Sequence, residues 1–242
     1  MTTLTQGARG ADVRRLQEAL NRKLQPGRVL VLDGDYGPIT RMAVRRLQAA
    51  NWLAEDGEAG PSTQNVLFDR ESHAPILHPV ALIPQPTPTQ CWAACTAMIT
   101  RSNVQAVVAR TPADLIADDG GLRTFPDADD AMRADALFAS AHGLAVRPPS
   151  PWSVKALRDA LQHGPLMIDL RWSAKGYAAG IGSPGHMILV AGIRGDNDAS
   201  GRGTTLRVFD PWPTTKGTRY SVNYVKWSAL VSENACRVFL RP

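Results

Sequence analysis

The sequence predicts an α+β protein in two parts, and three patterns in its 242 residues support this prediction. Apolar residues at helical spacing occupy much of the first 69 residues. A proline-rich stretch then leads into a helix-compatible segment that begins at Cys91. From Leu166 onward, apolar runs separated by turn residues predict about five antiparallel strands. We therefore expect a helical domain over residues 1–69, a linker over 70–82, and a domain with helices and an antiparallel sheet over 83–242.

Composition excludes several classes of protein. Apolar residues make up 44% of the chain and charged residues 20%, which fits a folded core and not a disordered chain. The net charge of +5 is spread without a basic run, so we expect no nucleic-acid partner. No apolar run approaches the ~20 residues of a membrane helix. The start, MTTLTQGARG, lacks the pattern of a signal peptide, so we expect synthesis in the cytoplasm and export by a non-Sec route or by lysis.

Metal and cofactor chemistry is also not expected. Three cysteines are too few for a disulfide framework. His73 and His78 fall in the predicted linker without a cysteine or carboxylate at metal-ligand spacing. Cys95 and Cys236 are expected to be core residues, and His142 and His163 each precede a glycine at the predicted end of a helix.

An eight-residue pattern, D-G-x-x-G-P-x-T, occurs twice in the predicted helical domain, at 33–40 and at 56–63. Glycine supplies the positive φ of a turn, and proline at the first helical position sacrifices no needed N–H. Apolar stripes precede, separate and follow the two copies. They predict a compact three-helix unit from Val13, Leu16, Leu20, Leu24, Val44, Leu47, Val66 and Leu67.

These blocks, together with Gly7, Gly10 and the pairs Leu16-Gln17 and Leu47-Gln48, resemble the peptidoglycan-binding domain family over roughly residues 4–68. The resemblance implies that this part holds the protein on bacterial cell wall, where such domains commonly anchor hydrolases. It implies ligand contacts at Asp33, Tyr36 and Gly37. The alternative is that these residues serve only the turns.

Cys91 follows a segment that cannot be helical, because Pro84, Pro86 and Pro88 force extended backbone. Thr89 is placed to cap a helix that begins near Cys91. A thiolate in a first helical turn faces unpaired N–H groups and the positive end of the helix dipole, which stabilises the anion. The position therefore suits a nucleophile, with simple packing as the alternative.

A nucleophilic cysteine needs a base, a residue that orients the base, and donors for the developing oxyanion. His186 opens an apolar run that predicts a buried strand, entered through a turn at 182–185. Asp210 ends the next run, which begins at Thr204. If the two runs pair as neighbouring antiparallel strands, His186 and Asp210 would meet. Asp169, in the strand before them, is a second candidate for the acidic partner.

The second part of the chain resembles the papain-like cysteine peptidases over roughly residues 80–240. Gln85 and Cys91 stand at Q-x5-C spacing, Trp92 follows, and Gly185-His186 and Asp210-Pro211-Trp212 come later in the expected order. Bacterial members with a CWAA-type motif match best, and the bacteriocin-processing peptidases look like more distant relatives.

The resemblance implies Cys91 as nucleophile, His186 as base and later acid, and Asp210 as the residue that holds the imidazole. The Gln85 amide and the Cys91 backbone N–H would form the oxyanion hole. Trp92 and Trp212 would contact substrate, and Trp212 would also shield the His–Asp pair. Two departures are an Asp where papain has Asn, and Thr89-Gln90 in place of papain's Cys-Gly-Ser.

The leading expectation is a cysteine peptidase or amidase with a Cys-His-Asp triad, targeted to cell wall, with an antibacterial effector as one use. The substrate would be peptidoglycan or a peptide, and an inhibitor or immunity protein would be a further partner. Three alternatives remain open: a protease toxin acting on proteins with the wall domain for delivery, a transglutaminase-like acyl transferase, and a wall-binding protein without activity.

Overall fold

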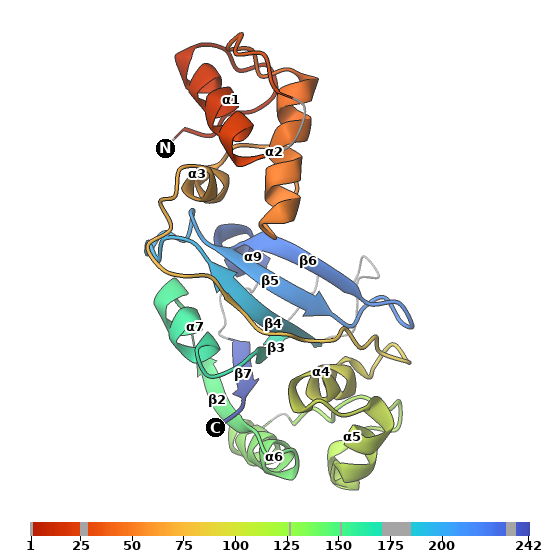
Figure 1. The fold of residues 1–242 in the computed structure, drawn as a ribbon. Coiled ribbons are helices and arrows are strands. Elements are labelled where there is room, and N and C mark those ends of the chain that lie inside the picture. The colour runs from red at the N-terminus through yellow and green to blue at the C-terminus, as the bar shows by residue number, and fades with distance from the viewer. Residues whose placement is uncertain (1, 25–28, 126, 151, 171–184, 231–235) are drawn as a thin grey trace. The chain divides into compact units, whose positions relative to one another are not determined.

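The computed structural model describes residues 2–24, 29–125, 127–150, 152–170, 185–230 and 236–242 (Figure 1). Two compact units emerge from the contacts between residues. Unit 1 contains residues 1–75, 193–206 and 221–226, and unit 2 contains residues 76–192, 207–220 and 227–242. The turn expected at 182–185 lies mostly outside the described residues, as does the side chain of Cys236.

Three helices form the N-terminal part of unit 1: α1 (Ala11–Lys23), α2 (Pro38–Ala50) and α3 (Pro61–Leu67). Helices α2 and α3 both begin with proline after an extended glycine, as the repeated pattern predicts. Their apolar faces meet in one core that includes Val13, Leu16, Leu20, Val44, Leu47 and Leu67. The predicted three-helix unit is confirmed.

The turn in each repeat is hydrogen-bonded to a buried glutamine side chain of the preceding helix. Gln17 donates to the Asp33 carboxylate (2.7 Å), the Asp35 carbonyl and the Thr40 hydroxyl, and its own carbonyl accepts the Gly34 N–H. Gln48 makes the same four bonds one repeat later, to Asp56 (2.8 Å), Glu58, Thr63 and Gly57. Both glutamines are 1% exposed, so this bonding explains why the pattern recurs with its fixed spacing.

Seven strands form one sheet in the part of the chain that the structure describes, in the order β2-β7-β3-β4-β5-β6, with β1 also pairing with β4. Antiparallel registers join β2 to β7, β3 to β4 and β3 to β7. The strands are β1 (Ile76–Leu77), β2 (Ala145–Ser150), β3 (Leu166–Leu170), β4 (His186–Arg194), β5 (Thr205–Asp210), β6 (Thr218–Asn223) and β7 (Cys236–Leu240). The five from β3 onward are those that the sequence predicts.

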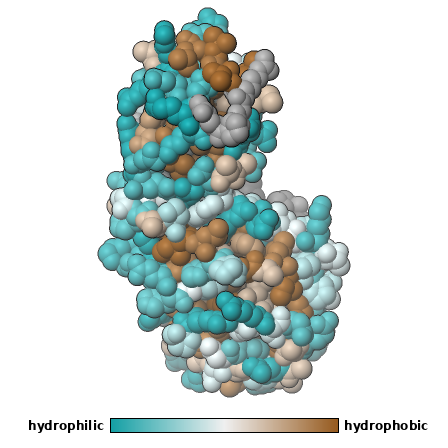
Figure 2. All heavy atoms as spheres, in the orientation of Figure 1, coloured by the Kyte–Doolittle hydropathy of each residue, from teal (hydrophilic) through white to brown (hydrophobic). Residues whose placement is uncertain are grey.

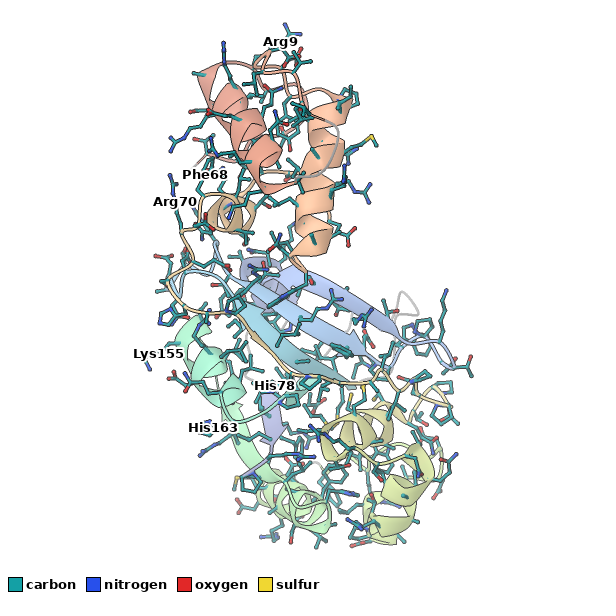
Figure 3. The ribbon with its side chains drawn as sticks, in the orientation of Figure 1. Arg9, Phe68, Arg70, His78, Lys155 and His163 are labelled. Carbon is teal, nitrogen blue, oxygen red and sulfur yellow. The ribbon has the colours of Figure 1, made fainter. Side chains whose placement is uncertain are left out.

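The two additional strands had weak signals in the sequence. β2 contains Pro148 and Pro149, and it lies at an edge of the sheet, where a missing N–H costs no ladder bond. β1 lies within the expected linker, and the next residue, His78, donates its N–H to Ala191 and bonds Leu161 through its ring (Figure 3). Gly192 permits this pairing, because a Cβ there would lie 2.6 Å from the Ile76 carbonyl oxygen.

Helices of unit 2 pack on a core that contains β3, β4 and β7 residues. Trp92 and Phe138 meet edge to face with centroids 5.9 Å apart, and Phe138 meets Phe239 in the same way at 5.3 Å. The helices are α4 (Cys91–Thr100), α5 (Val104–Arg110), the 3-10 turn η1 (Ala113–Leu115), α6 (Ala128–Ala141) and α7 (Val154–Leu161). Helix α9 (Tyr224–Leu230) begins in unit 1 and continues into unit 2.

The surface is mostly polar on the face drawn in Figure 2, with apolar residues gathered in a few places. Some of the most exposed large apolar side chains belong to the chain around the start of α2, namely Val29, Val31, Ile39 and Met42. Among the described residues, every helix is too short or too polar to span a lipid bilayer.

Candidate active site

Cys91 is the first residue of α4, as the proline-rich segment before it predicts. Its side chain is 5% exposed, and its sulfur accepts the Met187 N–H at 3.5 Å. The expected cap differs: Gln90 is the N-cap and makes no side-chain cap bond. Thr89 instead donates its hydroxyl to the Asp119 carbonyl at 2.7 Å. The first N–H groups of α4 therefore keep no capping side chain, which leaves them near the thiol.

His186 lies between Cys91 and Asp210. β4 begins at His186 and β5 ends at Asp210, and the two strands are neighbours in the sheet. His186 Nε2 lies 2.7 Å from Asp210 Oδ1, and the imidazole also hydrogen-bonds Cys91. Because Nε2 is used by Asp210, Nδ1 is the ring nitrogen that remains for the thiol. The side chains of His186 and Asp210 are only 6% and 16% exposed.

The charge of His186 depends on these two partners. Burial by itself lowers the pKa of His186, but hydrogen bonds to Asp210 and Cys91, and the negative charges of both, raise it to about 9. The imidazole is thus protonated at neutral pH. An imidazolium in contact with Cys91 stabilises a thiolate there, which is the reactive form of cysteine.

The two candidate acidic residues occupy different environments. Asp210 Oδ1 accepts the Trp212 N–H at 2.8 Å as well as the bond from His186. Asp169 lies opposite Met187 in the β3–β4 register, and its carboxylate accepts from Arg237 Nε at 2.8 Å. Arg237 also pairs with Asp135, so the charge of Asp169 is compensated within its own cluster.

Gln85 is fully buried at 0% exposure. Its backbone bonds Pro211 and Thr215, which ties the segment before α4 to the chain that follows β5. One N–H of its side-chain amide donates to the Thr87 carbonyl at 2.8 Å, while its side-chain carbonyl oxygen has no protein partner. The amide therefore has a fixed orientation and a second N–H that the Thr87 bond does not use.

The two tryptophans of the expected site differ in exposure. Trp92 is 2% exposed, and its indole N–H donates to the Gly120 carbonyl at 3.1 Å. This position in the core offers substrate no ring face. Trp212 is half-buried, and its backbone is held to Asp210.

Sequence reasoning missed two features of the site. Tyr220, on β6, is close enough to Asp210 that burial and then the charge of Asp210 raise its pKa. The second feature is the turn from Ala117 to Gly121, which is anchored to the start of α4 through Thr89 and Trp92. Two consecutive glycines were the available signal for a close approach of backbone there.

Cys95 lies one turn beyond Cys91 and is buried, as expected for a core residue. Its thiol donates to the Met187 carbonyl at 3.2 Å. Burial, with the nearby charges of Cys91 and Asp210, raises the pKa of Cys95 well above its usual value. The two thiols of α4 thus have opposite environments, one beside a cation and one in the core.

The candidate wall-contact residues of unit 1 are used mainly by its own turns. The Asp33 carboxylate accepts from Gln17 and from the Asp35 N–H, and Gly37 is the N-cap of α2. These hydrogen bonds lower the pKa of Asp33. Tyr36 is 0% exposed, and its hydroxyl donates to the Gly57 carbonyl at 2.9 Å. The ring and hydroxyl of Tyr36 are therefore inside the unit and face no ligand.

No group of three or more His, Cys, Asp or Glu side chains among the described residues is arranged to hold a metal ion. The histidines outside the Cys91 region have local partners. His142 caps α6 and bonds the Thr111 hydroxyl at 2.9 Å, while His163 follows the C-cap of α7 and bonds the Asp159 carbonyl. Burial, with the charge of Arg110, lowers the pKa of His142.

Comparisons with known proteins show which families the two parts of the chain match. The family described as "Papain-like cysteine protease AvrRpt2" matches residues 76–227, and the family described as "Putative peptidoglycan binding domain" matches residues 9–67. No curated protein matches the chain. A similar solved structure is the crystal structure of Burkholderia AP3 phage endolysin, with 31% identity over 46% of this chain and a TM-score of 0.28. The match spans 38% of the endolysin chain, so most of that protein has no counterpart here.

Proposed function

Because the chain belongs to the papain-like cysteine protease AvrRpt2 family, we propose that it hydrolyses peptide or amide bonds with Cys91, His186 and Asp210. The observation that carries the proposal is the hydrogen-bonded series from the Cys91 thiol through His186 to Asp210. Each role of a cysteine peptidase has an occupant in that series. Cys91 is the nucleophile, His186 is the acid and base, and Asp210 orients the imidazole.

The first half of the reaction forms an acyl-enzyme. The Cys91 thiolate attacks the substrate carbonyl carbon, and the carbonyl electrons move to oxygen. The developing oxyanion accepts hydrogen bonds from the Cys91 backbone N–H and from the unused N–H of Gln85. When the tetrahedral intermediate collapses, the imidazolium of His186 gives its proton to the leaving amine. The products of this half are a free amine, a thioester on Cys91 and a neutral imidazole.

The second half releases the acid. Neutral His186 takes a proton from water, and the hydroxide formed attacks the thioester carbonyl. Collapse of the second intermediate expels the Cys91 thiolate, and the imidazolium is restored beside it. Asp210 keeps Nε2 of the ring hydrogen-bonded throughout, so the other nitrogen stays directed at the sulfur.

Unit 1 adds a wall-attachment function. A peptidoglycan-binding domain associates a protein with the cell wall, and the match of residues 9–67 supports that role here. Attachment raises the effective concentration of wall-linked peptides around the enzyme. We therefore favour stem peptides or wall-associated proteins as substrates.

The test is incubation of the purified chain with sacculi and, separately, with an unfolded protein, followed by mass spectrometry of muropeptides and of protein fragments. We expect new cleavage products from at least one substrate, and none from a Cys91→Ala variant. Cys95→Ala is the matched control, since it removes the other thiol of α4 and should leave cleavage intact. The proposal fails if neither substrate is cut, or if Cys91→Ala cuts as well as the wild type.

The same assays separate the alternatives. Unaltered muropeptides with cleavage of the protein would assign the activity to proteins, with unit 1 serving delivery. Incorporation of an added amine without net hydrolysis would identify an acyl transferase, because the thioester would then be attacked by an amine instead of water. A Cys91 that reacts with iodoacetamide no faster than an ordinary thiol would indicate a wall-binding protein without activity.

A further inference from the structure

The side of helix α2 that faces solvent takes no part in the catalytic proposal. The helix buries its other side in unit 1 through Thr40, Ala43, Val44, Leu47 and Gln48. At about 3.6 residues per turn, the opposite side carries Ile39, Met42, Arg45 and Arg46. Spacings of three and four residues make these four side chains neighbours on one surface, which we call the α2 face.

Two side chains of the α2 face are apolar and exposed. Met42 is 65% exposed and Ile39 is 50% exposed, and they lie one helical turn apart. Isolated apolar side chains are ordinary on a protein surface, whereas apolar side chains that adjoin one another are typical of contact surfaces. Both residues keep at least half of their surface outside the core of unit 1. The α2 face therefore offers apolar area to a partner.

The α2 face is also cationic. Helix α2 contains three arginines and neither aspartate nor glutamate. Arg45 and Arg46 are exposed, and no ion pair in the described part of the chain includes either of them. Arg41 differs, since its guanidinium donates to the Asp56 carbonyl at 3.4 Å, beside the second repeat turn. Arg45 and Arg46 thus place two positive charges without an acidic partner next to Met42.

Helix α1 shows that this combination is not a general property of unit 1. The segment V-R-R-L-Q occurs in α1 at 13–17 and again in α2 at 44–48. Acidic residues lie among the arginines of α1, and Glu18 pairs with Arg22 at 3.0 Å. None of the most exposed large apolar side chains of the described residues belongs to α1. The surface of α1 is therefore polar with charges of both signs, while the α2 face is cationic and partly apolar.

We propose that the α2 face binds the surface of a membrane that contains anionic phospholipids. Arg45 and Arg46 bind lipid phosphates, and Ile39 and Met42 enter the boundary between headgroups and acyl chains. A soluble polyanion would use the arginines and leave the apolar side chains in water. A second copy of the α2 face would bring arginines against arginines. An anionic lipid surface is the partner that uses both kinds of side chain.

The experiment measures sedimentation of the full chain with vesicles of equimolar phosphatidylglycerol and phosphatidylcholine, beside vesicles of phosphatidylcholine alone. We expect binding to the anionic vesicles and little binding to the neutral ones. Arg45→Gln combined with Arg46→Gln removes both charges and keeps long side chains. This variant should bind the anionic vesicles about 25-fold more weakly, or about fivefold for each arginine. Met42→Ser changes no charge and should weaken binding about tenfold, because apolar burial is lost.

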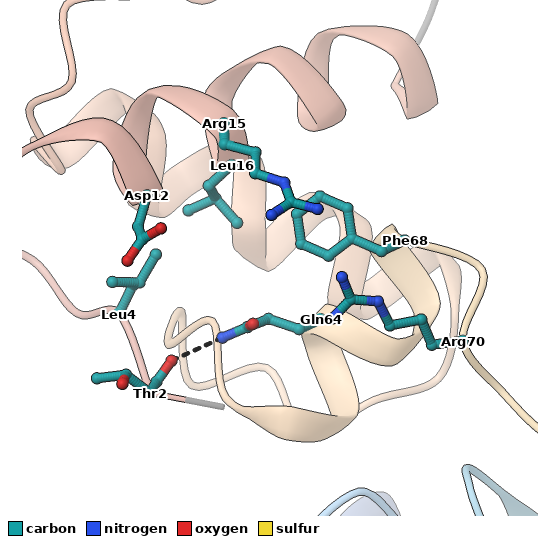
Figure 4. Close-up of a pocket in the computed structure, with 8 residues that line it drawn as sticks. All are labelled: Thr2, Leu4, Asp12, Arg15, Leu16, Gln64, Phe68 and Arg70. Atoms are coloured by element: carbon teal, nitrogen blue, oxygen red, sulfur yellow. Dashed lines mark hydrogen bonds between the residues drawn. The ribbon is translucent and has the colours of Figure 1, made fainter.

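Arg14→Gln combined with Arg15→Gln is the matched control, because it removes two charges from the corresponding positions of α1. Arg15 lies over the Phe68 ring at a separate pocket of about 210 Å³, and no residue of α2 lines that pocket (Figure 4). Binding of this control to anionic vesicles should stay within about twofold of the wild type, since salt screens charges away from the contact. Circular dichroism establishes that each variant is folded.

Three outcomes would overturn the proposal. One is equal binding to neutral and anionic vesicles, and another is an equal loss of binding in the α1 control. The third is a Met42→Ser chain that binds anionic vesicles as tightly as the wild type, because the α2 face would then act only through its charge. A dimer of the wild-type chain that Met42→Ser abolishes would assign the α2 face to a second copy instead. Hydrolysis of a soluble peptide is measured separately, so these outcomes do not depend on the catalytic proposal.

Discussion

Asp210 controls the charge of His186, and this leads to a prediction about pH. The pKa of His186 is raised to about 9 by Asp210 and Cys91 against the effect of burial. His186 should therefore stay protonated up to about pH 9, and kcat/KM of the free enzyme should fall above that pH. Asp210→Ala removes the hydrogen bond to His186 and the negative charge beside it, so the pKa of His186 should fall and the alkaline limb of the pH–rate profile should move to lower pH. The value of kcat should also drop on the order of 100-fold. Rates from pH 5 to 10 on a soluble peptide measure both.

Asp169→Asn is the comparison for this experiment. In the wild type the Asp169 carboxylate binds Arg237 and not His186. The alkaline limb of the pH–rate profile should therefore keep its position in the Asp169→Asn variant. A limb that moves with Asp169→Asn and stays in place with Asp210→Ala would reverse the assignment of the acidic partner. Circular dichroism of each variant shows whether the fold is retained.

The role proposed for Gln85 in the oxyanion hole depends on how its side-chain amide is oriented. Its amide is held by the Thr87 carbonyl, and its second N–H is the one assigned to the oxyanion. Gln85→Ala should lower kcat by about 100-fold to 1,000-fold with little change in KM, because the donor acts mainly in the transition state. A loss of thermal stability with unchanged kcat would mean that Gln85 only fastens the segment before α4.

The places of Cys91, His186 and Asp210 in the fold were predictable because residue type and chain order carry that information. The cysteine follows three prolines, which indicates the start of a helix. The histidine begins an apolar run and the aspartate ends the next one, which indicates the ends of two neighbouring strands. Tyr220 carried no such signal, since its proximity to Asp210 depends on strand pairing. Trp92 and Tyr36 were misleading in another way. An aromatic side chain next to a functional motif can lie in the core or face a ligand at the surface. Which of the two occurs depends on how the surrounding elements pack, and the sequence does not show this.

At the level of elements, the repeated D-G-x-x-G-P-x-T turns depend on Gln17 and Gln48. Each glutamine is buried and makes four hydrogen bonds, so its removal leaves several buried polar groups without partners. Gln17→Ala and Gln48→Ala should each lower the free energy of unfolding by about 1–3 kcal/mol. Urea denaturation measures this loss.

Gln6→Ala, at an exposed position of the same unit, is the control for that measurement and should change stability by less than about 0.5 kcal/mol. Similar losses for the two buried glutamines would agree with their equivalent bonding. A loss at only one of them would show that the repeats are not equivalent in energy. No loss at either would contradict the role assigned to these bonds.

The helices and the central strands followed from periodicity, while β1 and β2 did not. β1 has only two residues, too few for any period, and it depends on the close approach that Gly192 allows. β2 contains two prolines, which argue against a strand unless an edge position is known beforehand. Both strands exist because a partner elsewhere in the chain completes their hydrogen bonding, and sequence reasoning does not supply the partner.

For the whole molecule, the net charge of +5 predicts how wall binding responds to salt. Attraction between a cationic protein and an anionic wall is screened as the Debye length falls from about 10 Å at 0.1 M salt to about 3 Å at 1 M. The fraction of Cys91→Ala protein that sediments with sacculi should therefore fall over this range. Hydrolysis of an uncharged soluble peptide by the wild-type chain should change much less, because the His186–Asp210 pair is buried. A bound fraction independent of salt would exclude a substantial charge contribution.

The pairing of β1 with β4 also bears on how such a protein can be cut and recombined. The strand begins at Ile76, the residue at which the protease family match begins. A fragment started at residue 83 would therefore lose the pairing of β1 with β4, which lies beyond the residues of β4 that pair with β3. A graft that exchanges the N-terminal anchor for another targeting module should therefore keep Ile76 with the peptidase. Evolution by domain shuffling meets the same constraint, and a crossover upstream of Ile76 preserves the sheet intact.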